Sequence, residues 1–70
     1  MDILIFKTDI EKEKSASISS LLNKVNGIRN WSIDHEDIDK VLRVEADKIS
    51  ENDIIDVVST AGFHCEELTW

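Results

Sequence analysis

The chain has 70 residues and a single cysteine, so it is expected to form one domain over residues 1–70 without an internal disulfide. Its 15 acidic and 8 basic residues give a net charge of −7, which disfavours nucleic acid and anionic membranes as partners because both attract cationic patches. No basic segment precedes a long apolar run at the N-terminus, and no run approaches the roughly 20 apolar residues of a membrane span, so a cytoplasmic protein is expected.

A strand and a helix are predicted first. Asp2 to Lys7 (DILIFK) is a short, nearly continuous apolar run, which is typical of a central strand. The following segment has apolar residues at the i, i+3, i+4 and i+7 positions of a helix, which together form one stripe. These residues are Ile18, Leu21, Leu22 and Val25.

The sequence leaves the start of this helix open. Thr8 and Glu11 have the spacing of a capping box, which allows a start as early as position 9, whereas Ser15 or Ser17 favours a later start. Gly27 is expected to end the helix, because glycine readily takes the left-handed conformation at a helix C-terminus.

A hairpin is predicted next. Ile28 to Asp34 alternates between apolar and polar residues, as does Lys40 to Ala46, and the acidic connector His35 to Asp39 between them is too polar for a core element. The short connection favours an antiparallel pair. One face of the later strand is expected to be buried, with the residues Leu42, Val44 and Ala46.

A second helix and a last strand complete the chain. Ser50 and Asp53 are spaced as a helix cap before a helix over Glu51 to Ala61, and Gly62 is expected to end it. Its buried stripe is predicted to contain Ile54, Ile55, Val58 and Ala61. Phe63 to Leu68 is predicted to be a short strand.

The order β-α-β-β-α-β predicts an α+β fold of the ferredoxin-like type. In this arrangement a four-stranded antiparallel sheet carries both helices on one face. The two helical stripes then share one core with a single sheet face, and the other face of the sheet remains in solvent.

Four short motifs extend this prediction, because they occur in the same order and at the same separations as in a known family of this fold. They are IFKTDI at Ile5 to Ile10, VNGI at Val25 to Ile28, KVLRVE at Lys40 to Glu45 and AGF at Ala61 to Phe63. With them the chain resembles, over nearly its whole length, the heavy-metal-associated domain. This is the family of small copper chaperones and of the N-terminal modules of metal-pumping ATPases.

The resemblance implies a C-x-x-C motif between the first strand and the first helix, where two thiolates hold a soft ion such as Cu(I). Counted from the IFKTDI match, the cysteines should fall at about Lys12 and Ser15, and both are missing. The apolar residue that usually precedes the motif is kept as Ile10. We therefore expect a degenerate metal site, no metal ligands at these positions and no cofactor.

The alternative is a metal-binding or transport protein that holds copper or zinc with non-standard ligands, either His64 and Cys65 or a site shared in a dimer. Adjacent strand residues point to opposite faces and cannot chelate one ion together. Cys65 is expected to be a small buried hydrophobe and His64 an exposed residue. His35, in its acidic loop, is expected to be solvated.

No catalytic or cofactor-binding motif is present in the sequence, and a small two-layer domain offers little room for a pocket, so no enzyme is expected.

Because similar metal chaperones dock through the end of the domain that carries the metal motif, the resemblance implies a candidate docking surface for a protein partner. It consists of Ile10, Glu11, Lys12, Lys14 and Phe63. The alternatives are a plain polar surface and a relic domain without a direct partner. A monomer is favoured, and the C-terminal Trp70 is expected at the sheet edge or in solvent.

Overall fold

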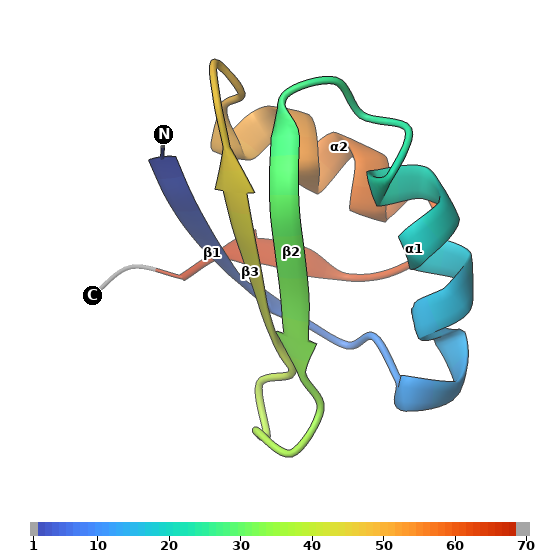
Figure 1. Cartoon of the computed structure of the whole chain (residues 1–70). Helices are drawn as coiled ribbons and strands as arrows, with labels where there is room; N and C mark the ends of the chain where they lie inside the picture. Colours follow the sequence, from blue (N-terminus) through green and yellow to red (C-terminus); the bar gives the residue numbers. More distant parts are fainter. Residues whose placement is uncertain (1, 69–70) are drawn as a thin grey trace.

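The computed structural model describes residues 2–68 and shows two helices on one face of a four-stranded antiparallel sheet (Figure 1). The elements in order are β1 (Asp2–Thr8), the 3-10 turn η1 (Lys12–Lys14), α1 (Ser15–Leu22), β2 (Ile28–Asp34), β3 (Val41–Ala46), α2 (Glu51–Thr60) and β4 (Cys65–Glu67). The predicted ferredoxin-like fold is confirmed. Trp70 lies outside the described residues. Neither helix of the described chain is long and apolar enough to cross a membrane.

The first strand lies inside the sheet, as its apolar sequence predicts. The strand order is β2-β3-β1-β4, and β1 pairs antiparallel with β3 on one side and with β4 on the other. Side chains alternate along a strand. Leu4, Phe6 and Thr8 are therefore buried beneath the helices, whereas Ile3 on the opposite face is 47% exposed. The sheet thus has one dry face and one wet face.

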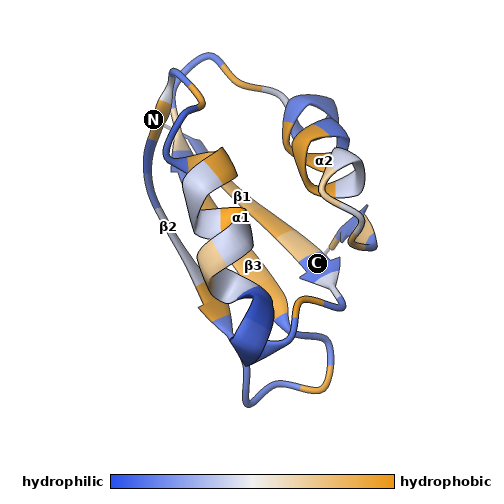
Figure 2. Cartoon of the chain, turned by 90° about the vertical axis from the view of Figure 1, so that its right-hand side faces the viewer, coloured by the Kyte–Doolittle hydropathy of each residue, from blue (hydrophilic) through white to orange (hydrophobic). Residues whose placement is uncertain are grey.

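One hydrophobic core fills the space between the sheet and the helices. The strands β1 and β3 are hydrophobic where they run behind the two helices (Figure 2). The core residues are Leu4, Phe6, Ile10, Ile18, Leu22, Leu42, Val44, Ala46, Ile54, Val58 and Cys65. Each large side chain in this set contributes roughly 1.5–3 kcal/mol by leaving water, so this core is the main source of stability.

The α1 helix is shorter than its apolar stripe predicts. Ile18 and Leu22 are fully buried, but Leu21 remains 36% exposed. Since α1 ends at Leu22, Val25 lies in the following turn, where it is half-buried. The prediction of one continuous helical stripe through Val25 is therefore wrong.

The start of α1 also differs from the capping-box alternative. The Thr8 hydroxyl does not cap a helix that includes Glu11, because it donates to the carbonyl oxygen of Lys40 at 2.6 Å. A 3-10 turn over Lys12–Lys14 comes first, and α1 begins at Ser15. The later of the predicted starts is thus the closer one, although Ser15 is the first helical residue and not its cap.

Gly27 does not cap α1, contrary to the prediction, because the helix has already ended. It has a φ of 101°, as expected for a glycine, but its role is in the turn into β2. Its carbonyl oxygen accepts the N–H of Asp47 at 2.8 Å. A Cβ at this position would lie 2.7 Å from the Asp47 carbonyl oxygen and 2.7 Å from Ile49 Cδ1. Two distant chain segments meet here, and only glycine fits between them.

The α2 helix carries both predicted caps. The Ser50 hydroxyl accepts the N–H of Asp53, and the Asp53 carboxylate accepts the N–H of Ser50 at 3.0 Å. At the other end Gly62 has a φ of 95°, and the N–H of Phe63 donates to the Val58 carbonyl oxygen at 3.2 Å. The N–H of Gly62 donates to the Ser59 carbonyl oxygen at 3.0 Å, and the two bonds together form a Schellman motif. Within the predicted stripe, Ile54 and Val58 are buried, and Ile55 and Ala61 are half-buried.

The last strand is shorter than predicted. β4 covers Cys65–Glu67, whereas the prediction covered Phe63 to Leu68. Phe63 completes the turn after α2, and the His64 N–H is accepted by the Asp9 carboxylate at 2.8 Å. Neither residue is therefore free to extend the ladder with β1.

Candidate functional site

The turn between β1 and α1 contains the two positions where the resemblance places metal-binding cysteines. Lys12 begins η1 and Ser15 begins α1. The Ser15 hydroxyl donates to the Lys12 carbonyl oxygen at 2.8 Å, and the Lys12 side chain is exposed. One position therefore presents an ammonium group, and the other presents an alcohol that is already used within the turn. Neither supplies the soft sulfur ligand that Cu(I) prefers.

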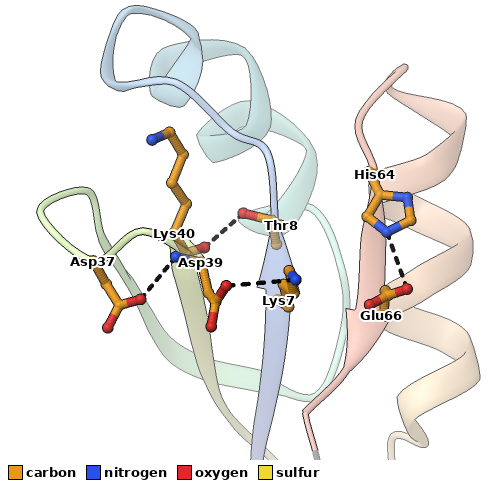
Figure 3. Close-up of polar contacts among 7 residues, drawn as sticks. All are labelled: Lys7, Thr8, Asp37, Asp39, Lys40, His64 and Glu66. Atoms are coloured by element: carbon orange, nitrogen blue, oxygen red, sulfur yellow. Dashed lines mark hydrogen bonds and ion pairs between the residues drawn. The ribbon is translucent and has the colours of Figure 1, made fainter.

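Thr8 anchors this turn to the acidic loop between β2 and β3. Its N–H donates to the Asp39 carbonyl oxygen at 3.0 Å, and its hydroxyl donates to the Lys40 carbonyl oxygen (Figure 3). The same hydroxyl oxygen accepts the N–H of Ile10 at 3.3 Å. One buried side chain thus joins the base of the turn to a loop more than thirty residues further along the chain.

Asp9 anchors the turn to the segment after α2. Its carboxylate accepts the backbone N–H of His64 at 2.8 Å. Together, the contacts of Thr8 and Asp9 hold three loops at one end of the domain. The loop end is therefore ordered by the protein's own hydrogen bonds.

The candidate docking surface needs one correction. Ile10 is fully buried in the core, so its side chain cannot contact a partner. Ile10 lies two residues after the end of β1, and its apolar side chain packs into the core, where it is removed from water. Glu11, Lys12 and Lys14 are exposed, and Phe63 is half-buried against the core. The docking role of these four residues stays a prediction.

A shallow hollow of about 470 Å³ opens beside η1. It brings part of η1 together with the end of β2 and the β2–β3 loop, which are far apart in the sequence. Its lining residues are Glu11, Lys12, Glu13, Ile33, Asp34, His35, Glu36 and Lys40. His35, expected to be solvated, is half-buried, and its Nδ1 has no hydrogen-bond partner among the described residues. The hollow is predominantly acidic, and Lys14 and Phe63 lie outside it.

Cys65 occupies a buried position, as the sequence predicts. It is 8% exposed and lies opposite the buried Thr8 in the register of β4 with β1. Burial raises the pKa of the Cys65 thiol to about 11, and the charge of Glu66 adds to the rise. The thiol is thus protonated at neutral pH, whereas metal binding requires the thiolate.

His64 is exposed, as predicted, and lies beside a carboxylate rather than a thiol. Its Nε2 is 3.3 Å from Glu66 Oε1 (Figure 3). His64 precedes β4 and its exposed ring lies beside Glu66, whereas the Cys65 side chain is buried in the core, so the two side chains do not face a common site. Across residues 2–68, no three His, Cys, Asp or Glu side chains are grouped so that they could hold a metal ion.

Comparisons with solved structures give close matches in backbone over almost the full length. A copper-binding domain from HMA7, a P-type ATPase, has a TM-score of 0.84 and 25% identity, with 99% of this chain and 96% of that one covered. A structure reported under crosstalk between Cu(I) and Zn(II) homeostasis has a TM-score of 0.81 and 18% identity, with 97% and 100% covered.

The yeast copper transporter domain CCC2A, solved in apo and Cu(I)-loaded states, is also similar. Its TM-score is 0.79 at 18% identity, with 96% of this chain and 94% of that one covered. No protein-family model and no curated protein sequence matches the chain. The three structural matches confirm the predicted resemblance: the chain has the heavy-metal-associated-like fold of copper-chaperone-type domains.

These comparisons overturn the expectation that no cofactor is associated with this kind of chain. Two of the similar structures are described as copper-binding or Cu(I)-loaded, and the third concerns Cu(I) and Zn(II). The expectation rests on Lys12 and Ser15, which stand where the two cysteines of the family motif are missing.

Sequence reasoning missed the residues that organise the loop end. The sequence suggests Thr8 only as a helix cap, and Asp9 only as a possible first helical residue, because their partners lie far away in the chain. One local signal was available in the β2–β3 loop. Asp34 and Asp37 each accept a backbone N–H two residues further on, at 3.1 and 2.8 Å. Such turns are a known preference of aspartate.

Proposed function

We propose that this chain is a small, non-enzymatic heavy-metal-associated-like domain that acts as a protein-interaction module. In this proposal its two-cysteine site is degenerate, and the loop end around η1 is the docking surface. One observation carries the proposal. The Thr8 and Asp9 hydrogen bonds fasten this end to the β2–β3 loop and to the segment after α2, while Glu11, Lys12 and Lys14 remain exposed.

Preorganisation supports a docking role for this end. A loop that is already held by internal hydrogen bonds loses little conformational entropy when a partner binds. The hollow beside η1 is open and lined mostly by charged side chains. This lining suits contact with a protein surface better than the enclosure of a small substrate, because substrate pockets are usually concave and largely apolar.

The proposed partner is another protein of metal handling, with copper as the cargo. This choice is supported by the similar structures, which include a domain of a copper transporter and a domain of a P-type ATPase. A single domain over residues 1–70, a monomeric state and a cytoplasmic setting belong to the same proposal.

The test is an NMR titration of the 15N-labelled chain. The probes are the heavy-metal-associated domains encoded in the same organism, each added in apo and Cu(I)-loaded form. We expect chemical-shift changes at Glu11, Lys12, Lys14 and Phe63 with at least one probe, and weaker binding of the Glu11→Lys/Glu13→Lys variant. Absence of binding at millimolar probe, or shifts confined to the opposite end of the sheet, would overturn the proposal.

A further inference from the structure

The tip of the β2–β3 loop exposes a large apolar side chain. Ile38 is 93% exposed, whereas the other large exposed hydrophobic residues of the described chain, Ile3 and Leu21, reach 47% and 36%. Ile38 interrupts an acidic segment, with Glu36, Asp37 and Asp39 as its neighbours in sequence. An isoleucine that is almost completely in water gives nothing to the stability of the fold.

The loop holds Ile38 in a defined position. The Asp37 carboxylate accepts the N–H of Asp39 at 2.8 Å, and the Asp37 carbonyl oxygen accepts the N–H of Lys40 at 3.0 Å. Lys40 has a left-handed backbone, with a φ of 42°. These contacts form a closed turn around Ile38, so its exposure belongs to an ordered loop.

The same loop is fastened to the loop end around η1. Thr8 binds the carbonyl oxygens of Asp39 and Lys40, and Lys7 Nζ lies 3.5 Å from Asp39 Oδ1 (Figure 3). The β2–β3 loop and η1 lie at the same end of the domain (Figure 1). The hollow connects them, because it is lined by Lys12 and Glu13 of η1 with the preceding Glu11, and by His35, Glu36 and Lys40 of the loop. The loop that carries Ile38 is therefore fastened to the proposed docking end by hydrogen bonds and an ion pair.

We propose that Ile38 and the acidic groups around it form the second half of this docking surface. The partner is a protein whose contact face has an apolar pocket surrounded by lysine and arginine side chains. This inference rests on the proposed function and specifies the chemistry of the partner.

Charge decides the nature of that partner. The segments of residues 11–14 and 34–40 contain six carboxylates and three lysines, in a chain of net charge −7. Nucleic acid and anionic lipid would be repelled by such a surface, whereas a basic protein face would be attracted. An apolar anchor at the centre with a charged rim is the usual arrangement of a specific protein interface.

The experiment compares two isoleucine variants in the titration with heavy-metal-associated domains of the same organism. Ile38→Ser removes the exposed anchor, and Ile3→Ser removes an exposed isoleucine on the wet face of the sheet. We expect the parent to bind the domains with basic surfaces in preference to the acidic ones. Ile38→Ser should bind about ten- to a hundredfold more weakly, and Ile3→Ser should bind as the parent does. Thermal unfolding of Ile38→Ser should match the parent, since the side chain is outside the core.

The outcomes separate this inference from the proposed function. If the Glu11→Lys/Glu13→Lys variant loses binding but Ile38→Ser does not, the docking function stands and the Ile38 anchor is rejected. If the parent binds none of the domains, both are rejected. An equal loss in Ile38→Ser and Ile3→Ser also rejects the anchor. Raising NaCl from about 50 to about 300 mM should weaken binding, because screening reduces attraction between exposed charges.

Discussion

The hydroxyl group of Ser15 donates a hydrogen bond to the carbonyl oxygen of Lys12 at 2.8 Å. The two positions that would hold thiolates in a heavy-metal-associated domain are thus joined to each other within one turn. A hydroxyl and a backbone carbonyl close this turn, so the geometry of the turn and the ligand chemistry of its side chains are separate properties.

The first prediction concerns that separation. Lys12→Cys/Ser15→Cys should create a tight Cu(I) site, because both residues lie in the same turn at the start of α1, where the helix N-terminus favours thiolates. The measurement is competition with bicinchoninate under reducing conditions. Each single-cysteine variant serves as a control and should compete far less well. A double variant no better than the parent would show that the turn cannot bring two sulfur atoms together.

The second prediction tests the core. Leu22→Ala should lower the free energy of unfolding by about 2–5 kcal/mol, since Leu22 is fully buried. Leu21→Ala is the matched control, because Leu21 is the same residue type one position earlier and is 36% exposed. Its cost should be much smaller. Urea unfolding followed by circular dichroism gives both values, and equal losses would contradict the assigned face of α1.

The third prediction compares two glycines with nearly the same backbone conformation. Gly27→Ala and Gly62→Ala both place a side chain at a positive φ, which costs roughly 1–2 kcal/mol. At Gly27 the new Cβ also meets Asp47 and Ile49, whereas at Gly62 nothing lies within 4 Å. Gly27→Ala should therefore be clearly the more destabilising change in thermal unfolding. The reverse order would mean that the turn into β2 is wrongly described.

The fourth prediction is a pH dependence due to Cys65. Its pKa is raised to about 11 in the folded state from an ordinary 9.0, mainly by burial. The folded state therefore holds this proton more tightly than the unfolded state. Its contribution to stability is complete below pH 9 and is lost as the pH rises towards 11.

Two measurements check this prediction. Alkylation of Cys65 by iodoacetamide at pH 8 should be much slower in the folded chain than in urea. In addition, Cys65→Val should lose less stability than the parent between pH 9 and pH 11, because valine has no proton to release. Equal labelling rates in the folded and unfolded chain would show that the thiol is accessible.

The sequence by itself determined the succession of strands and helices, the hairpin, and the caps of α2. These features depend on residues close together in the chain, such as Ser50 with Asp53, or on a local period such as Leu42, Val44 and Ala46. It also determined that thiols are missing from the turn after β1, which needs no structure to establish.

Only the tertiary structure decided which residues organise the loop end. The Thr8–Lys40 and Asp9–His64 bonds join residues 32 and 55 positions apart, and no local pattern specifies such partners. The same limit explains the burial of Ile10, the partial exposure of Leu21 and the almost complete exposure of Ile38. Each depends on how separate elements pack together, because burial and long-range hydrogen bonding exist only once the whole chain has folded.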